Sequence, residues 1–180
     1  PGPVASRTFV ENSIKYALNK VSPDKIVLGI PFYGRYWNDT ESVGGNGISL
    51  AKANSVIKHY KGNVYLDKAT MSAYATFTIA NNDTKLLVNG KALTPGKYTI
   101  WFENEDSIKD KLQLVNKYNL KGTGSWSLGQ ELPSTWEYYK LLLNSKYFVD
   151  IENSWAKNDI ISIVGMGWMK GTSNVKFSPN

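Results

Sequence analysis

The sequence predicts an α/β fold, in which helices connect strands that run parallel to one another. Helical patterns and short apolar strands alternate in the order helix, strand, polar insert, helix, strand, helix. The two strands of this alternation fall at 25–30 and 123–128, and parallel strands need crossover helices of this kind. Two strands cannot close a sheet, so we expect parts of a longer protein to complete the core.

Composition excludes several kinds of chemistry. With 180 residues and 42% hydrophobic side chains, the chain is large enough for a packed core. The absence of cysteine excludes disulfides and thiol catalysis, and a single histidine argues against a Ser-His-Asp triad or a histidine-based metal site. We therefore expect no metal and no cofactor, and we expect His59 at a helix surface. Residues 1–9 lack a signal-peptide pattern, so any export signal would lie outside this chain.

Charge and aromatic content point to the type of partner. The net charge is +6, but the lysines are scattered, whereas a nucleic-acid site would gather them on one surface. We expect no nucleic-acid partner, and no apolar run approaches the roughly 20 residues of a membrane span. Six tryptophans and eleven tyrosines, many near glycines, suit stacking on sugars, although such rings more often fill cores.

The first predicted helix runs from about Ser6 to Val21. Ser6 can cap its amino end, and Ser22-Pro23 ends it. Its apolar residues recur on one face: Val10, Ile14, Ala17, Leu18 and Val21.

The strand at 25–30 follows after a short turn. Its run of branched apolar side chains is typical of a strand that is covered on both faces. It leads directly into 31–37, which hold a proline, a glycine, an arginine and four aromatic rings. Such residues are unusual directly after a core strand.

Residues 38–100 read as a compact α+β insert. A polar, glycine-rich loop at 38–47 precedes an amphipathic helix at 49–60. Three strand regions follow, at 63–67, 73–80 and 84–102, and the dipeptide Asn89-Gly90 predicts a hairpin within the last.

The remaining elements continue the alternation. We expect a helix at 107–118 with Ser107 and Asp110 as its amino-terminal box, a glycine-bearing strand with its exit loop at 122–129, and a helix at 134–144 with a box of Ser134 and Glu137. The inner face of the first of these helices is predicted to hold Ile108, Leu112, Leu114 and Val115.

Two segments in the correct order resemble glycoside hydrolase family 18. The stretch PDKIVLGIPFYGRYW at 23–37 matches the segment K-x-x-x-G-x-P-x-Y-G-R that members carry on their seventh strand. The stretch 98–131 is similar to the last helix and the eighth strand, including a tryptophan, here Trp126. The resemblance implies the C-terminal portion of a (β/α)₈ TIM barrel, divided into 1–37 (helix 6, strand 7), 38–100 (inserted α+β domain) and 101–144 (helix 7, strand 8, helix 8).

The resemblance also implies which residues bind substrate. Active sites of such barrels lie at the carboxyl ends of the strands. Tyr33, Arg35 and Trp126 would then line a sugar-binding groove, and Trp37 would either line it or pack the insert. For two neighbouring rings, Phe32 and Tyr36, we expect packing.

Three carboxylates near these segments invite a catalytic interpretation. We expect Asp106 to serve the helix amino terminus, and we expect Glu103 and Glu131 either to hydrogen-bond sugar hydroxyls or to have no role. Family members use an acidic D-x-x-D-x-D-x-E run and the 2-acetamido oxygen of the substrate for retaining catalysis. No such run occurs in these 180 residues, so we expect no catalytic residue in this segment and no hydrolysis by this chain alone.

The resemblance leaves several functions open. The leading one is hydrolysis of β-1,4 N-acetylglucosamine polymers such as chitin by the intact protein. Hydrolysis of peptidoglycan or spore-cortex glycan is the second candidate function. The other hypotheses are a non-catalytic carbohydrate-binding wall protein and a purely structural module.

The tail at 145–180 resembles the opening of an S-layer homology repeat. It contains F-x-D-I at 148–151, S-W-A-K at 154–157, a predicted helix at 156–164 and F-S-P-N at 177–180. Such repeats attach proteins to bacterial cell-wall polymers. The resemblance implies an extracellular, cell-surface or cell-wall location and a wall polymer as partner.

Overall fold

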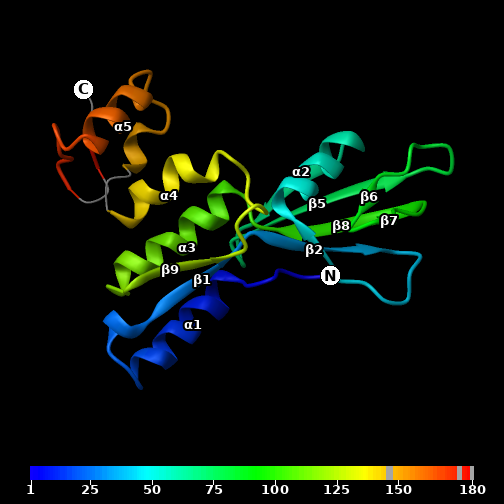
Figure 1. Cartoon of the computed structure of the whole chain (residues 1–180), viewed down its shortest axis with the longest axis horizontal. Helices are drawn as coiled ribbons and strands as arrows, with labels where there is room; N and C mark the ends of the chain where they lie inside the picture. Colours follow the sequence, from blue (N-terminus) through cyan, green and yellow to red (C-terminus); the bar gives the residue numbers. More distant parts are fainter. Residues whose placement is uncertain (145–147, 174–175, 179–180) are drawn as a thin grey trace.

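The computed structural model describes residues 1–144, 148–173 and 176–178. The chain forms a two-stranded α/β part, a five-stranded antiparallel part and a small helical tail (Figure 1). Together they give a mixed α/β fold, and the described residues form no closed barrel.

The α/β part is assembled from both ends of the first 144 residues. Its strands β1 (Val27–Pro31) and β9 (Gly122–Trp126) pair in parallel, from Val27 opposite Gly122 to Pro31 opposite Trp126. This confirms that the two predicted strands are parallel neighbours. Helices α1 (Arg7–Leu18), α3 (Glu105–Lys117) and α4 (Thr135–Leu143) and the 3₁₀ turn η1 (Pro23–Lys25) belong to the same part.

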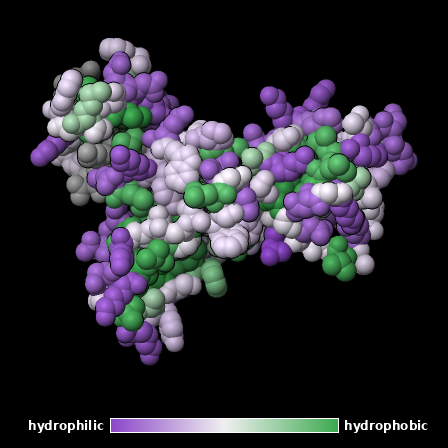
Figure 2. Space-filling view, in the orientation of Figure 1, coloured by the Kyte–Doolittle hydropathy of each residue, from purple (hydrophilic) through white to green (hydrophobic). Residues whose placement is uncertain are grey.

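Only one face of the β1–β9 pair is covered. Leu28 and Ile30 are buried with Ile14 and Leu112 in the core beneath the strands, whereas Val27 on the opposite face is 54% exposed. The prediction that this strand is covered on both faces was therefore wrong, because no described element packs over its second face. Figure 2 shows hydrophobic surface in the region where β1 lies in Figure 1.

The helix boundaries confirm some of the predicted caps and correct others. Ser6 caps α1 by accepting a hydrogen bond from the backbone N–H of Phe9, but the helix ends at Leu18, which leaves Val21 exposed. The expected box of Ser107 and Asp110 was wrong. Asn104 caps α3 instead, because its side chain accepts from the Ser107 N–H and the Ser107 hydroxyl accepts from the Asn104 N–H.

The second predicted capping box was also wrong. Ser134 precedes α4 in a helical backbone conformation and makes no capping hydrogen bond. A capping residue normally has extended dihedral angles, which direct its oxygen toward the first free N–H groups. The predicted inner face of α3 is confirmed, since all four of its apolar residues are buried.

The five-stranded sheet has the order β3-β2-β8-β5-β4 and is antiparallel throughout. Its strands are β2 (Tyr33–Asn38), β3 (Asn46–Ser49), β4 (Asn63–Asp67), β5 (Ser72–Ile79) and β8 (Gly96–Phe102). Helix α2 (Leu50–His59) covers one face, and the buried side chains between helix and sheet form a second core. His59 lies at the exposed end of α2, as expected.

The hairpin of β6 (Leu87–Val88) and β7 (Lys91–Ala92) turns at Asn89-Gly90, as predicted. Both turn residues have positive φ, 50° and 80°, which is the conformation that favours this dipeptide. Strand β3 was not predicted, since Asn46 and Gly47 were assigned to the glycine-rich loop and Ser49 to the following helix.

One residue separates the two sheets. Phe32 lies between β1 and β2, is fully buried, and contacts Trp136 and Tyr139 edge-on. Its N–H donates to the Trp126 carbonyl, and its carbonyl accepts from the Leu50 N–H. The motif at 25–37 therefore crosses from one sheet into the other, with Phe32 and Tyr36 packed in the two cores as expected.

The tail forms its own small core. Phe148, Ile151, Ile160 and Val164 pack together around η2 (Val149–Ile151) and α5 (Lys157–Gly165). The predicted helix at 156–164 is confirmed to within one residue. The last two residues of the F-S-P-N motif, and 145–147 at the start of the tail, lie outside the described residues. In the described part of the chain, no helix is both long and apolar enough to span a membrane.

Candidate functional site

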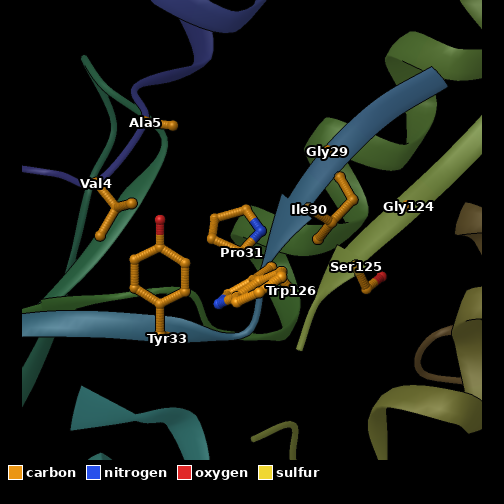
Figure 3. Close-up of a pocket in the computed structure, with 9 residues that line it drawn as sticks. All are labelled: Val4, Ala5, Gly29, Ile30, Pro31, Tyr33, Gly124, Ser125 and Trp126. Carbon is orange, nitrogen blue, oxygen red and sulfur yellow. The ribbon is translucent and has the colours of Figure 1, made fainter. Parts of the chain in front are cut away.

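A pocket of about 490 Å³ opens where β1 and β9 end (Figure 3). Three separate segments line it, namely residues 4–5 before α1, the end of β1 with Tyr33, and residues 124–126 of β9. Parallel strands place their carboxyl ends at one edge of the sheet, which is why segments so distant in sequence meet here.

Glycines form the floor of this pocket. Gly29 on β1 lies opposite Gly124 on β9. A Cβ atom added at Gly29 would meet nothing within 4 Å, so the space above this strand is open. Glycine inside a strand is typical of a place where a ligand approaches the backbone closely.

Trp126 projects from the end of β9 with 71% of its surface exposed. The preceding residue faces the other way, since the Ser125 hydroxyl lies 2.8 Å from that of Tyr139. Strand alternation then places Trp126 on the open face. The Trp126 carbonyl accepts from the Phe32 N–H at 2.7 Å, and the Trp126–Ser127 peptide bond is cis.

Tyr33, the first residue of β2, extends its ring into the same pocket, beside Trp126 and with its hydroxyl toward Val4 and Ala5 (Figure 3). The next residue explains its position. A Cβ at Gly34 would collide with the Trp101 carbonyl, so only glycine lets β2 approach β8 this closely.

Arg35 and Trp37 lie farther along β2 and do not line the pocket. They share a face of the strand with Tyr33. The Arg35 guanidinium donates to the Gly45 carbonyl at 2.6 Å, and Trp37 packs against Gly44 and Gly45. Of the four predicted binding residues, the structure brings Tyr33 and Trp126 together and places the other two along the inserted sheet.

The expectation for Glu103 was wrong. Its carboxylate is only 2% exposed and pairs with Lys111, at 2.9 Å between Oε2 and Nζ. Burial raises the pKa of Glu103, while the charge of Lys111 acts in the opposite direction. This carboxylate is closed off from any sugar.

The other two carboxylates have local roles. Asp106 lies in the first turn of α3, where the helix dipole favours negative charge, as expected. Glu131 accepts from the Gly129 N–H and from the Trp136 indole N–H, and backbone hydrogen bonds lower its pKa. None of the residues that line the pocket is acidic.

Sequence reasoning missed the small residues of the pocket. Val4 and Ala5 line the side of the pocket next to the Tyr33 hydroxyl, and Pro31 lies beside the Trp126 ring (Figure 3). For the pocket floor, Gly29 and Gly124 inside the two predicted strands were the available signal, because each glycine leaves a strand position without a side chain.

The comparisons with known proteins agree with this architecture. The sequence model described as "Glycosyl hydrolases family 18" matches residues 3–131. A cortical fragment-lytic enzyme of Bacillus subtilis is 27% identical over 143 residues, which are 78% of this chain and 29% of that protein. The B. subtilis protein named "Uncharacterized glycosylase YvbX" is 26% identical over 137 residues, 76% of this chain and 36% of that protein.

Solved structures share the fold. A chitinase from Chromobacterium violaceum superposes with a TM-score of 0.65 at 30% identity, covering 79% of this chain and 40% of that one. The spore cortex-lytic enzyme SleL of Bacillus megaterium gives 0.63 at 23% identity, covering 78% and 30%. The chain spans about a third of the length of its curated relatives. Since the family match covers well over half of its residues and includes both pocket strands, the chain belongs to family 18 of the glycosyl hydrolases.

Proposed function

We propose that this chain is the sugar-binding C-terminal part of a glycoside hydrolase that acts on β-1,4 N-acetylglucosamine polymers such as chitin. The observation that carries the proposal is the exposed indole of Trp126 beside Tyr33, above a floor of glycine backbone. An exposed indole suits the apolar C–H groups of a pyranose ring, and the open floor leaves room for one.

In this proposal, β1 and β9 are strands 7 and 8 of a (β/α)₈ barrel. Their uncovered face would turn toward the barrel interior, which explains why Val27 stays exposed while Leu28 and Ile30 are buried. The five-stranded sheet would form an inserted domain beside the barrel opening, at the carboxyl ends of β1 and β9. Arg35 and Trp37 remain proposed groove residues, reached by a ligand that extends beyond the pocket.

The role of this chain in the reaction is to hold the sugar. Trp126 and Tyr33 would fix the pyranose next to the scissile bond. In the family mechanism, the 2-acetamido oxygen attacks the anomeric carbon while a carboxylic acid protonates the departing oxygen, and water then opens the intermediate. The acid belongs to the D-x-x-D-x-D-x-E run, which these residues lack, so the 180-residue chain would bind without hydrolysing.

Calorimetric titration with an N-acetylglucosamine tetramer tests this function. Trp126→Ala should weaken binding by about 0.5–1.5 kcal/mol, the usual worth of an aromatic stacking contact. Trp155→Ala is the matched control, since that tryptophan is 95% exposed but lies in the tail. Equal binding by both variants would contradict the assignment, and release of reducing sugar by the purified chain would contradict the proposed lack of activity.

Bacterial wall glycan is the second candidate substrate. Cortical fragment-lytic and spore cortex-lytic enzymes among the relatives favour it. Parallel titrations with chitin oligomers and with muropeptides distinguish the two substrates. A loss of catalytic acid in the intact protein would instead favour a non-catalytic binding protein, and normal glycan binding after Trp126→Ala would favour a structural module.

For the tail we propose an S-layer homology role, with a cell-wall polymer as partner and an extracellular, wall-associated location. The small core around Phe148 and Ile151 and the helix α5 support a folded unit there. Sedimentation with purified wall sacculi, before and after chemical removal of their secondary polymer, tests it. Binding that survives removal of the polymer would contradict the role.

A further inference from the structure

A row of aromatic side chains crosses the face of the five-stranded sheet that α2 leaves uncovered. We call Tyr65, Tyr74 and Trp101 the aromatic ladder. They come from the neighbouring strands β4, β5 and β8 and lie in register, Tyr65 opposite Tyr74 and Tyr74 opposite Trp101. Their ring centroids are 5.1 and 4.9 Å apart and their planes differ by 25° and 28°, so the three rings form one continuous stack.

The ladder continues the face that leads out of the pocket. Trp101 lies opposite Arg35 on β2, and Arg35 is two residues beyond the pocket residue Tyr33 on the same side of that strand. The buried residues beneath α2 come from the opposite face of the sheet. A ligand leaving the pocket along β2 would therefore meet Arg35 and then the ladder.

The stacking determines which groups the ladder offers to a ligand. Tyr74 has a parallel ring on each side, so both of its faces are occupied and an edge remains. The edges carry the phenol groups of Tyr65 and Tyr74 and the indole N–H of Trp101. Among the described residues, none forms a hydrogen bond with these three groups.

The surroundings of the ladder are mostly polar. The next row on this face holds Asn63, Thr76 and Thr99 and ends at Trp37 on β2. Arg35 lies at one end of the ladder, opposite Trp101, and its guanidinium donates to the Gly45 carbonyl. An apolar protein surface would leave these groups without hydrogen bonds, whereas a saccharide carries hydroxyl and amide groups along its length. Rings that are already fixed by mutual stacking also lose little conformational freedom when a ligand binds.

We infer that the aromatic ladder is a second glycan-contact surface, which binds the flank of a long saccharide through hydrogen bonds from ring edges. It differs from Trp126, whose face is free to stack. This inference rests on the proposed function, because the ladder serves a chain whose other end occupies the pocket.

Titrations with an N-acetylglucosamine dimer and hexamer test the inference on the 180-residue chain. The double variant Tyr65→Phe/Tyr74→Phe keeps the stacked rings and removes both hydroxyls. It should weaken hexamer binding by at least about 5-fold and leave dimer binding unchanged, since a dimer fills only the pocket. Tyr16→Phe is the matched control, as that tyrosine is 68% exposed on α1, away from the sheet.

Trp126→Ala separates the two possible failures, with circular dichroism to verify that each variant is folded. If Trp126→Ala weakens both oligomers but the double variant binds the hexamer as tightly as wild type, the ladder inference is overturned and the proposed function stands. If Trp126→Ala changes neither, or wild type binds no hexamer, the proposed function fails and the ladder inference fails with it.

Discussion

Lys111 and Glu103 form an ion pair that is almost completely withdrawn from water. Their charged atoms are 2.9 Å apart, and the two side chains are 0% and 2% exposed. Glu103 follows the last strand of the inserted sheet, and Lys111 lies on α3 of the α/β part. The pair therefore joins the two parts of the molecule at the point where the chain returns from the insert.

Breaking this pair should be costly. Lys111→Met leaves a buried carboxylate without its charged partner, so urea unfolding should show a loss of about 3–5 kcal/mol in the free energy of unfolding. Glu103→Gln/Lys111→Met should recover much of that loss, because no buried charge remains. Lys117→Met, at an exposed pair with Glu11, is the control and should cost far less. Equal losses in both single variants would contradict this account.

Glu11 should make stability depend on pH in the acid range. Hydrogen bonds from Lys117, Tyr118 and Arg7 lower its pKa from 4.5 to about 2. The folded state therefore favours the charged form, and this stabilisation is present above pH 4.5 and is lost as pH falls toward 2. Thermal unfolding of Glu11→Gln should show a smaller loss of stability between pH 5 and pH 2 than wild type. An identical acid profile would count against this role of Glu11.

A substitution at Gly29 in the pocket floor should impair sugar binding without impairing folding. Gly29→Val adds a side chain to open space, so the chain should fold with unchanged stability. The new methyl groups would occupy the volume above β1, and affinity for an N-acetylglucosamine tetramer should fall at least about 10-fold. Gly165→Val, which also points into open space but lies in the tail, should bind normally. Undiminished binding by Gly29→Val would exclude this pocket as the sugar site.

The two helix starts give a matched pair of capping tests. Asn104→Ala removes the side-chain oxygen that accepts from the Ser107 N–H and caps α3, and it should cost about 1 kcal/mol in chemical unfolding. Ser134→Ala should cost much less, since Ser134 caps nothing. A larger loss for Ser134→Ala than for Asn104→Ala would contradict this account and would support the Ser134–Glu137 capping box expected from the sequence.

Much of the fold follows from local patterns. The alternation of helices and strands predicted the parallel pairing of β1 with β9, and Asn89-Gly90 predicted its hairpin. Strand β3 was missed because Asn46 and Gly47 carry no strand signal, and only pairing with β2 defines it. The burial of Lys111 was missed for a similar reason. A lysine on a helix is expected to be exposed, and only its distant partner Glu103 explains why it is buried.

The site was predictable only in part. Tyr33 and Trp126 were found through the family motifs, and both line the pocket. Arg35 and Trp37 come from the same matching stretch but lie outside the pocket. Strand β2 continues into the inserted sheet, so each second residue along it lies farther from the pocket. Val4 and Ala5 precede the first helix, and no local pattern reports that they close the pocket.

The central proposal is that N-acetylglucosamine chains lie against Trp126. Its most direct test is a ¹H–¹⁵N spectrum of the 180-residue chain, which contains six tryptophan indole N–H signals, recorded during titration with an N-acetylglucosamine tetramer. We predict that the Trp126 signal, assigned through the Trp126→Ala variant, shifts in a saturable way. A Trp126 signal that stays fixed while those of Trp155 or Trp168 in the tail move would contradict the proposal.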